Sequence, residues 1–226
     1  MNSRVFKTKE DLAQSAAETL VQRIRAGARS IGLSGGSSPR RMYEILGSRF
    51  QEELRAIDLI WVLEDERCVP PEHEESNSRM IGRSLFAGGM ATAHRFLRFR
   101  TELQEPPVIA REFERDWHHG SLQGLDVAVL GVGDDGHTAS LFPGTDIFSV
   151  TSRVAAEVYV PKLEAWRVTL TLPVLEKAAF HLVIATGESK RPIIEQVKEG
   201  ADLPIAQVVK VSGQTWWFLD EAASPG

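Results

Sequence analysis

A glycine-rich stretch in the second half of the chain holds the residues best suited to acid–base chemistry. It reads LGVGDDGHTASLFPGT over residues 130–145, with Asp135 two residues before His137. An unperturbed imidazole has a pKa of about 6.5, which suits proton transfer near neutral pH. We therefore expect His137 to act as a general base and Asp135 to orient its ring. Any helix that starts at Thr138 should end at Pro143.

The same stretch also matches a dinucleotide-binding fingerprint. Gly131, Gly133 and Gly136 have the spacing G-x-G-x-x-G. That fingerprint needs a long helix after the third glycine, packed back on the sheet. Here Pro143 follows within two turns, and a proline inside a helix costs about 3 kcal/mol. The sequence therefore disfavours a nicotinamide or flavin cofactor.

A second glycine pair has the features of an anion site. Residues 30–33 read as a short buried strand, and SGGSSP follows before a helix that begins near Pro39. Gly35 and Gly36 let the backbone approach a ligand, and a helix N-terminus offers free N–H groups to a phosphate. A tight strand-to-helix turn is the alternative. No Gly-Lys-Ser/Thr follows, so this is not a Walker A loop.

Two further loops bring charged residues to the ends of predicted strands. Residues 57–63 form an apolar strand that leads directly into Glu-Asp-Glu-Arg, ending at Arg67. A solvated turn is the usual fate of such a run, but sites form at strand ends in open α/β sheets. Residues 187–190, GESK, follow another apolar strand, 181–185. The adjacent pair His118 and His119 does not share a helical face and gives no metal site.

These loops require an α/β scaffold. Further strands are expected at 95–99, 125–130, 154–160, 167–172 and 216–218, and helices at 8–26, 76–86, 107–117, 174–178 and 191–197. Strands that alternate with helices indicate a mostly parallel sheet covered on both faces. We expect one domain over residues 1–226, with a disordered tail from residue 221, and all four loops at one edge of the sheet.

Composition excludes several function classes. The 226 residues are 42% hydrophobic and 25% charged, as in ordinary globular proteins, and the net charge of −5 argues against a nucleic-acid partner. No 18-residue apolar run occurs, so no membrane span is expected. The single cysteine, Cys68, excludes an internal disulfide and fits a reducing cytoplasm. No residue cluster has the spacing of metal ligands, and we expect no metal.

Taken together and in this order, SGGSSP, EDERCVPPEHEESN, GVGDDGHTASLFPGT and GESK resemble the glucosamine-6-phosphate isomerase/6-phosphogluconolactonase family. The resemblance covers residues 31–218. It implies a Rossmann-like three-layer α/β/α fold without a cofactor. It also implies hydrolysis of 6-phospho-D-glucono-1,5-lactone to 6-phosphogluconate, the second step of the oxidative pentose phosphate pathway. The partner would be this small phosphosugar lactone, with the protein a monomer or small homo-oligomer.

The resemblance suggests a role for each candidate residue. His137 would be the base, with Asp135 as its orienting group or as a contact to sugar hydroxyls. The phosphate would accept hydrogen bonds from the backbone N–H groups of Gly35, Gly36 and Ser37. The side chains of Arg67, Lys190 and Arg167 would add positive charge beside it. Asp65 and Asn77 would bind hydroxyls or hold Arg67. The oxyanion donors are not identified.

Two other functions remain open. Amino-sugar deaminases of the same group carry Asn-Glu-Pro after the histidine segment, whereas this chain has Leu141, Phe142 and Pro143. The missing glutamate argues against ring-opening isomerase chemistry. A phosphosugar-sensing module without turnover would need a partner domain, and no DNA-binding helix pair is found.

Overall fold

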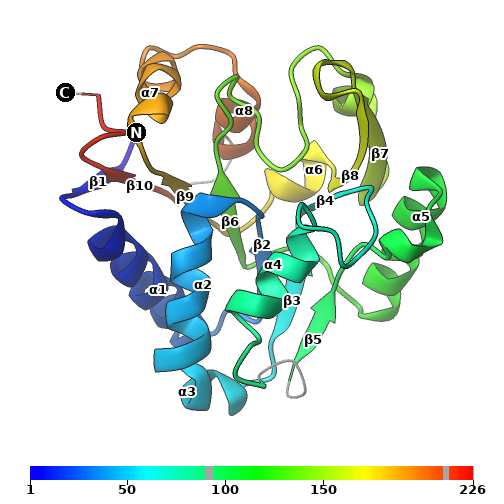
Figure 1. Ribbon diagram of the computed structural model, residues 1–226, viewed down its shortest axis with the longest axis horizontal. Helices are drawn as coiled ribbons and strands as arrows, with labels where there is room; N and C mark the ends of the chain where they lie inside the picture. The colour runs from blue at the N-terminus through cyan, green and yellow to red at the C-terminus, as the bar shows by residue number, and fades with distance from the viewer. Residues whose placement is uncertain (90–93, 211–213, 226) are drawn as a thin grey trace.

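A seven-stranded sheet forms the centre of the protein (Figure 1). The computed structural model describes residues 1–89, 94–210 and 214–225. Within them the strand order is β1-β10-β9-β6-β2-β3-β5, and each neighbouring pair is parallel. The bounds are β1 (Ser3–Phe6), β2 (Ser30–Leu33), β3 (Ile60–Leu63), β5 (Arg95–Leu97), β6 (Val127–Gly131), β9 (Phe180–Ala185) and β10 (Thr215–Asp220).

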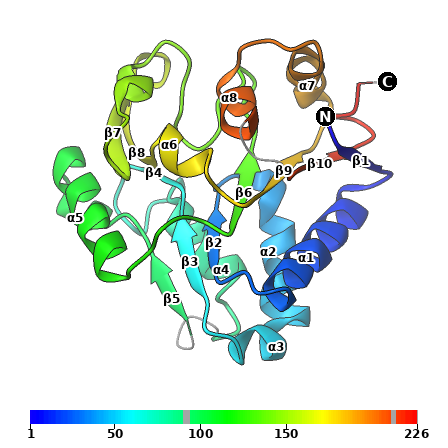
Figure 2. The same ribbon diagram turned by 180° about the vertical axis from the view of Figure 1, so that it is seen from behind.

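Helices cover both faces of this sheet. Figure 1 shows α2 and α4 in front of the strands, and Figure 2, from the opposite side, shows α6 in front of them. The helices are α1 (Lys9–Arg25), α2 (Ser37–Arg49), α3 (Gln51–Arg55), α4 (Asn77–Ser84), α5 (Pro106–His119), α6 (Leu172–Leu175), α7 (Arg191–Lys198) and α8 (Pro204–Lys210). The expectation of a mostly parallel sheet between helical layers is therefore confirmed.

A second, smaller sheet stands beside the first. It is antiparallel, with the order β4-β8-β7, and comprises β4 (Asp65–Arg67), β7 (Ala155–Val160) and β8 (Ala165–Leu170). Helix α5 packs against β7 and β8 on the right of Figure 1. The sequence predicted a loop where β4 lies. This segment is a strand because it pairs with the edge of β8, where Arg67 lies opposite Arg167.

Local sequence explains why the main elements begin where they do. The Thr8 side chain accepts a hydrogen bond from the backbone N–H of Asp11 and caps α1. The Ser76 side chain caps α4 in the same way, with Arg79 as donor. Every residue of β9 is buried, as expected for a central parallel strand of continuous apolar sequence.

Three other features differ from the sequence-based predictions. No helix starts at Thr138: residues 138 and 141 instead form an isolated bridge, and a 3-10 turn follows at Asp146–Ser149. Strand β1 and helices α3 and α8 were not predicted. The tail was expected to be disordered, but Ala223 is fully buried and donates its N–H to Asp220. Residue 226 lies outside the described residues.

The strand order places the four candidate loops together. Strands β9, β6, β2 and β3 are consecutive neighbours in the sheet. Since all four are parallel, the segments that follow them leave from the same edge, at the top of Figure 1. This is the edge at which ligands bind in open α/β sheets.

Candidate active site

A cavity of ≈ 440 Å³ opens at this edge of the sheet. Its lining draws on the segments after β2, β3, β6 and β9 and on β8. Of the ten residues predicted for the site, nine line it: Gly35, Gly36, Ser37, Asp65, Arg67, Asn77, His137, Arg167 and Lys190. Asp135 is not among the lining residues. Because Gly35 and His137 share one cavity, they lie at one edge of the sheet, as expected.

The SGGSSP segment forms the N-terminus of α2. Gly36 is its N-cap, with a φ of 95°, and no side chain caps the helix. A Cβ on Gly36 would meet no atom within 4 Å, so the backbone is open to a ligand. The Ser38 hydroxyl lies 3.0 Å from the Thr186 hydroxyl and ties this turn to the segment after β9. The uncapped first turn leaves N–H groups free for an anion.

Gly35 also makes room for a side chain of the site. A Cβ at this position would lie 1.9 Å from Oδ1 of Asn77. The close approach of the Asn77 amide therefore requires a glycine at this position. Asn77 in turn donates from Nδ2 to the backbone carbonyl of Asp65 at 2.9 Å.

Asp65 is held from two sides. Its Oδ2 accepts a hydrogen bond from the Ser140 hydroxyl at 2.7 Å, and its Oδ1 lies 3.3 Å from Nδ2 of Asn77. The side chain is buried yet lines the cavity. Asp65 thus contacts both Asn77 and Ser140. The Arg67 guanidinium instead donates to the Glu75 carbonyl at 2.6 Å.

Glu66 anchors the segment that carries these groups. Its buried carboxyl accepts from the N–H groups of Asn77 at 2.7 Å and Ser78 at 2.8 Å, at the start of α4. The N–H of Arg67 also donates to it, at 2.8 Å. Burial raises the pKa of Glu66 and these hydrogen bonds oppose the rise. The residue fixes β4 to α4 below the cavity.

Three cations face the cavity. Arg67 and Arg167 lie opposite each other on β4 and β8. Burial, with the neighbouring charge of Arg67, lowers the pKa of Arg167. Lys190 reaches Asp134 at 2.5 Å, and this pairing lowers the pKa of Asp134. Two arginines this close in a half-buried site favour an anionic ligand between them.

His137 and Asp135 form a close pair. Nδ1 of His137 lies 2.5 Å from Oδ1 of Asp135, which also accepts from the His137 backbone N–H at 3.1 Å. An ionised carboxylate only accepts hydrogen bonds, so Nδ1 carries the proton and Nε2 keeps its lone pair. The ring stacks on Phe142 with centroids 4.0 Å apart. Asp135 therefore occupies the place of an orienting acid.

Burial changes the acidity expected of His137. The pKa falls to about 4 because burial disfavours the charged ring, although the carboxylates of Asp65 and Asp134 oppose this. The cations Lys190 and Arg67 add to the lowering. The sequence-based value near 6.5 is therefore too high. The neutral imidazole is the form present at physiological pH.

Several residues near the site were not predicted. Ser140 and Phe142 lie within the glycine-rich stretch, but their contacts depend on how the chain turns after Thr138. Lys162 forms an ion pair with Oδ2 of Asp135 from the β7–β8 connection. Nothing in the spacing of Lys162, which lies 27 residues further along the chain, marks it as a neighbour of Asp135.

The described residues lack both a metal-binding cluster and a membrane-spanning helix. They contain no group of three or more His, Cys, Asp or Glu side chains that could hold a metal ion. Among those same parts of the chain, no helix has the length and apolar character to cross a membrane.

Known proteins resemble this chain over nearly its full length. The family model described as glucosamine-6-phosphate isomerases/6-phosphogluconolactonase matches residues 7–217. The 6-phosphogluconolactonase of Bos taurus is 34% identical over 238 residues, 97% of this chain and 91% of its own. The solved 6-phosphogluconolactonase of Trypanosoma brucei is 26% identical with a TM-score of 0.84, covering 98% of this chain and 97% of that one.

A solved structure with another activity has the same fold. A monomeric glucosamine-6-phosphate deaminase superposes with a TM-score of 0.81 over 99% of this chain and 98% of its own. Its sequence identity is only 20%, so the likeness extends to the fold alone.

Proposed function

This chain belongs to the glucosamine-6-phosphate isomerase/6-phosphogluconolactonase family, and we propose that it hydrolyses 6-phospho-D-glucono-1,5-lactone to 6-phosphogluconate. The observation that carries this proposal is the His137–Asp135 pair at 2.5 Å beside a cavity with three cations. A lactone is an activated ester, and its hydrolysis needs a base for water and a grip on the phosphate.

His137 is the proposed base. Its Nε2 takes a proton from the water that attacks the lactone carbonyl, while Nδ1 donates to Asp135 and supports the imidazolium that forms. A base with a pKa of about 4 is unprotonated at neutral pH. The imidazolium that forms is a strong acid, which favours transfer of the proton to the leaving oxygen.

The proton held by His137 is then used in the second half of the reaction. The tetrahedral intermediate collapses with cleavage of the bond between the carbonyl carbon and the ring oxygen. The imidazolium gives its proton to that oxygen, which becomes a hydroxyl group. The new carboxylic acid ionises in solvent, so one water is consumed and the base is restored.

The phosphate is proposed to lie at the N-terminus of α2. Gly36 and Ser37 line the cavity at the uncapped start of α2, where the helix adds positive potential. Arg67, Arg167 and Lys190 supply charge-assisted contacts, the arginines as forks and the lysine as a point charge. Asp65 and Asn77 would contact sugar hydroxyls.

The test is to generate the lactone in place with a glucose-6-phosphate dehydrogenase and follow its decay with and without this protein. The expected result is decay well above the spontaneous rate, with 6-phosphogluconate as product, and its loss in His137→Ala. Decay at the spontaneous rate would overturn the proposal.

Glucosamine 6-phosphate serves as the matched control substrate. The chain has Leu141, Phe142 and Pro143 where the deaminases of this group carry Asn-Glu-Pro. No ammonia release is expected, because the glutamate that would assist ring opening is missing. Ammonia release at a rate above that of lactone hydrolysis would favour the deaminase.

A further inference from the structure

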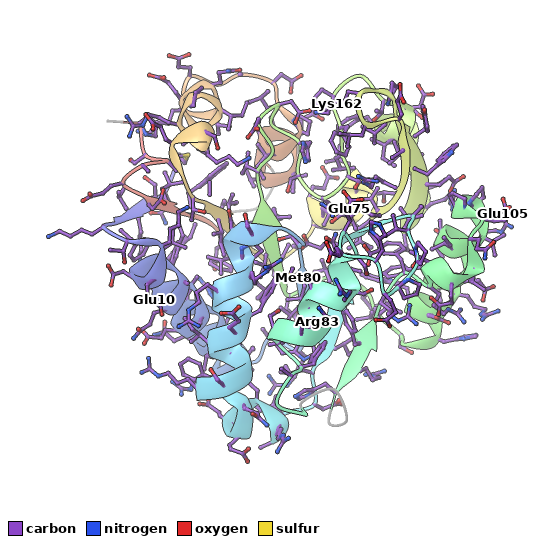
Figure 3. The ribbon with its side chains drawn as sticks, viewed as in Figure 1. Glu10, Glu75, Met80, Arg83, Glu105 and Lys162 are labelled. Carbon is purple, nitrogen blue, oxygen red and sulfur yellow. The ribbon has the colours of Figure 1, made fainter. Side chains whose placement is uncertain are left out.

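Lys162 reaches the proposed catalytic pair from a separate part of the fold. It lies in the 3-10 turn Pro161–Leu163 between β7 and β8. Figure 3 shows it at the upper end of this hairpin, beside the loop that follows β6. Its ammonium group contacts Oδ2 of Asp135, while Oδ1 of the same carboxylate accepts from His137. Lys162 thus contacts the oxygen of Asp135 that His137 leaves unused.

The lysine also touches the other partner of the imidazole. Its Nζ lies 4.9 Å from the centroid of Phe142, within cation–π range. Phe142 stacks on His137 at 4.0 Å. Four side chains therefore close a ring of contacts, in the order Lys162, Asp135, His137, Phe142. The imidazole is fixed by a hydrogen bond in its plane and by a ring against its face.

We propose that Lys162 is a positioning residue, which holds Asp135 and Phe142 so that Nε2 of His137 points at the substrate. This inference rests on the proposed function of His137. Lys162 has no part in binding the phosphate: it is not among the lining residues, and its contacts are to Asp135 and Phe142. The contact to Oδ2 leaves Oδ1 of Asp135 in place as the acceptor for Nδ1 of His137.

Other charged side chains surround His137, and they act on its pKa together with Lys162. They come from four further segments: Asp134 and Asp135 after β6, Asp65 and Arg67 on β4, Arg167 on β8, and Lys190 after β9. Loss of the Lys162 charge removes one cation from this group and leaves its carboxylates unchanged. The imidazolium is then favoured, and the pKa of His137 should rise.

The pair is half exposed, with side-chain exposures of 50% for Lys162 and 30% for Asp135. Such ion pairs add little to stability. Loss of the lysine should therefore change geometry and protonation at His137 without unfolding the protein, which makes the residue testable by substitution.

The kinetic test compares Lys162→Met and Lys162→Arg with the parent. We expect Lys162→Met to lower kcat roughly five- to twentyfold with KM changed less than about twofold, since an interaction that orients the base acts on the chemical step. Lys162→Arg keeps the cation and should recover most of the loss. The control is Lys177→Met, at an exposed lysine remote from the cavity, which should behave as the parent.

A titration of His137 by NMR gives a readout that a merely structural lysine would not move. We expect its pKa to rise by about half a unit or more in Lys162→Met, and the acid limb of kcat/KM to move to higher pH by the same amount. The NMR signal of His137 is identified by its absence from the spectrum of His137→Gln. The titration does not need turnover, so an inactive parent would overturn the proposed function while the titration still decides the role of Lys162.

Two results would overturn the inference. One is a higher KM and weaker binding of 6-phosphogluconate in Lys162→Met with kcat unchanged, which would make Lys162 a substrate contact. The other is a variant with parental kcat and an unchanged His137 titration.

Discussion

Gly133 lies directly against the imidazole of His137. A Cβ at Gly133 would be 2.0 Å from Cε1 and Nδ1 of the ring, well inside van der Waals contact. The backbone reinforces this approach, because the N–H of Gly133 donates to the His137 carbonyl at 2.8 Å. The glycine-rich turn thus shapes the space in which the ring stands.

The first prediction follows from this contact. Gly133→Ala should displace the His137 ring from Asp135 and lower kcat by about 10²-fold or more, since misplaced catalytic groups lose their advantage of orientation. Gly124→Ala is the control, because a Cβ there meets nothing within 4 Å. Steady-state lactone hydrolysis measures both. Parental kcat in Gly133→Ala would show that the ring has room to move without loss.

Removal of the base should leave binding intact. His137→Ala is expected to fold, to bind 6-phosphogluconate, and to hydrolyse the lactone about 10²–10⁴-fold more slowly. Calorimetric binding and background-corrected kinetics separate the two effects. A folded variant that keeps more than about a tenth of the parental kcat would remove His137 from this role.

The pH profile has a defined sign. The base must be neutral to act, and the folded pKa is about 4, so kcat/KM should rise from acid pH through about 4 and be flat near pH 6.5. The same lowered pKa means that the folded protein binds fewer protons at His137 than the unfolded chain, so stability falls as pH drops from 6.5 to 4. A limb centred near 6.5 would contradict the effect of burial.

The proposed phosphate grip is tested by removing one cation at a time. Arg67→Ala and Lys190→Ala should each raise KM more than they lower kcat, at a cost of about 1.5–3 kcal/mol for one charge-assisted contact. Arg83→Ala is a matched control, since Arg83 is exposed and outside the cavity lining. Unchanged affinity for 6-phosphogluconate in both variants would show that the phosphate lies elsewhere.

Glu64 should make the protein less stable at neutral pH. Its carboxyl is fully buried behind Gly32. Burial, aided by the charge of Asp65, raises its pKa well above the usual value. The stability tied to its proton is complete below pH 4.5 and is lost as pH rises.

Glu64→Gln removes this dependence. Relative to the variant, the parent should lose unfolding free energy by about 1.4 kcal/mol per pH unit above 4.5, until the folded carboxyl ionises. Urea unfolding at pH 5 and pH 7 measures the difference, with the exposed Glu74→Gln as control. Parallel curves for parent and Glu64→Gln would contradict it.

Sequence alone predicted most of the main sheet. Apolar runs such as the one that becomes β9 are long, uniform and bounded by turns, and these properties do not depend on distant partners. Strand β4 was predicted as a loop, because three charged residues become a strand only when β8 supplies the opposite edge. Helix α8 has only seven residues, Pro204–Lys210, too few for a clear periodic signal.

The site was predictable to the extent that its residues follow strands. His137, Arg67 and Lys190 lie a few residues beyond the ends of β6, β3 and β9, so the topology of the main sheet brings them to one edge. Contacts that depend on the path of a loop were not accessible. Ser140 reaches Asp65, 75 residues away, and the burial that lowers the pKa of His137 is a property of the packed protein.

The small antiparallel sheet carries two of the arginine and lysine side chains of the cavity and the lysine that contacts Asp135. Arg67, Arg167 and Lys162 belong to β4, β8 and the β7–β8 turn, whereas His137 and the α2 N-terminus belong to the seven-stranded sheet. A hairpin graft over residues 155–170 would therefore exchange two cations without altering any strand of the main sheet. Chimaeras with other hairpin sequences at these positions could be screened for hydrolysis of lactones that carry other anionic groups.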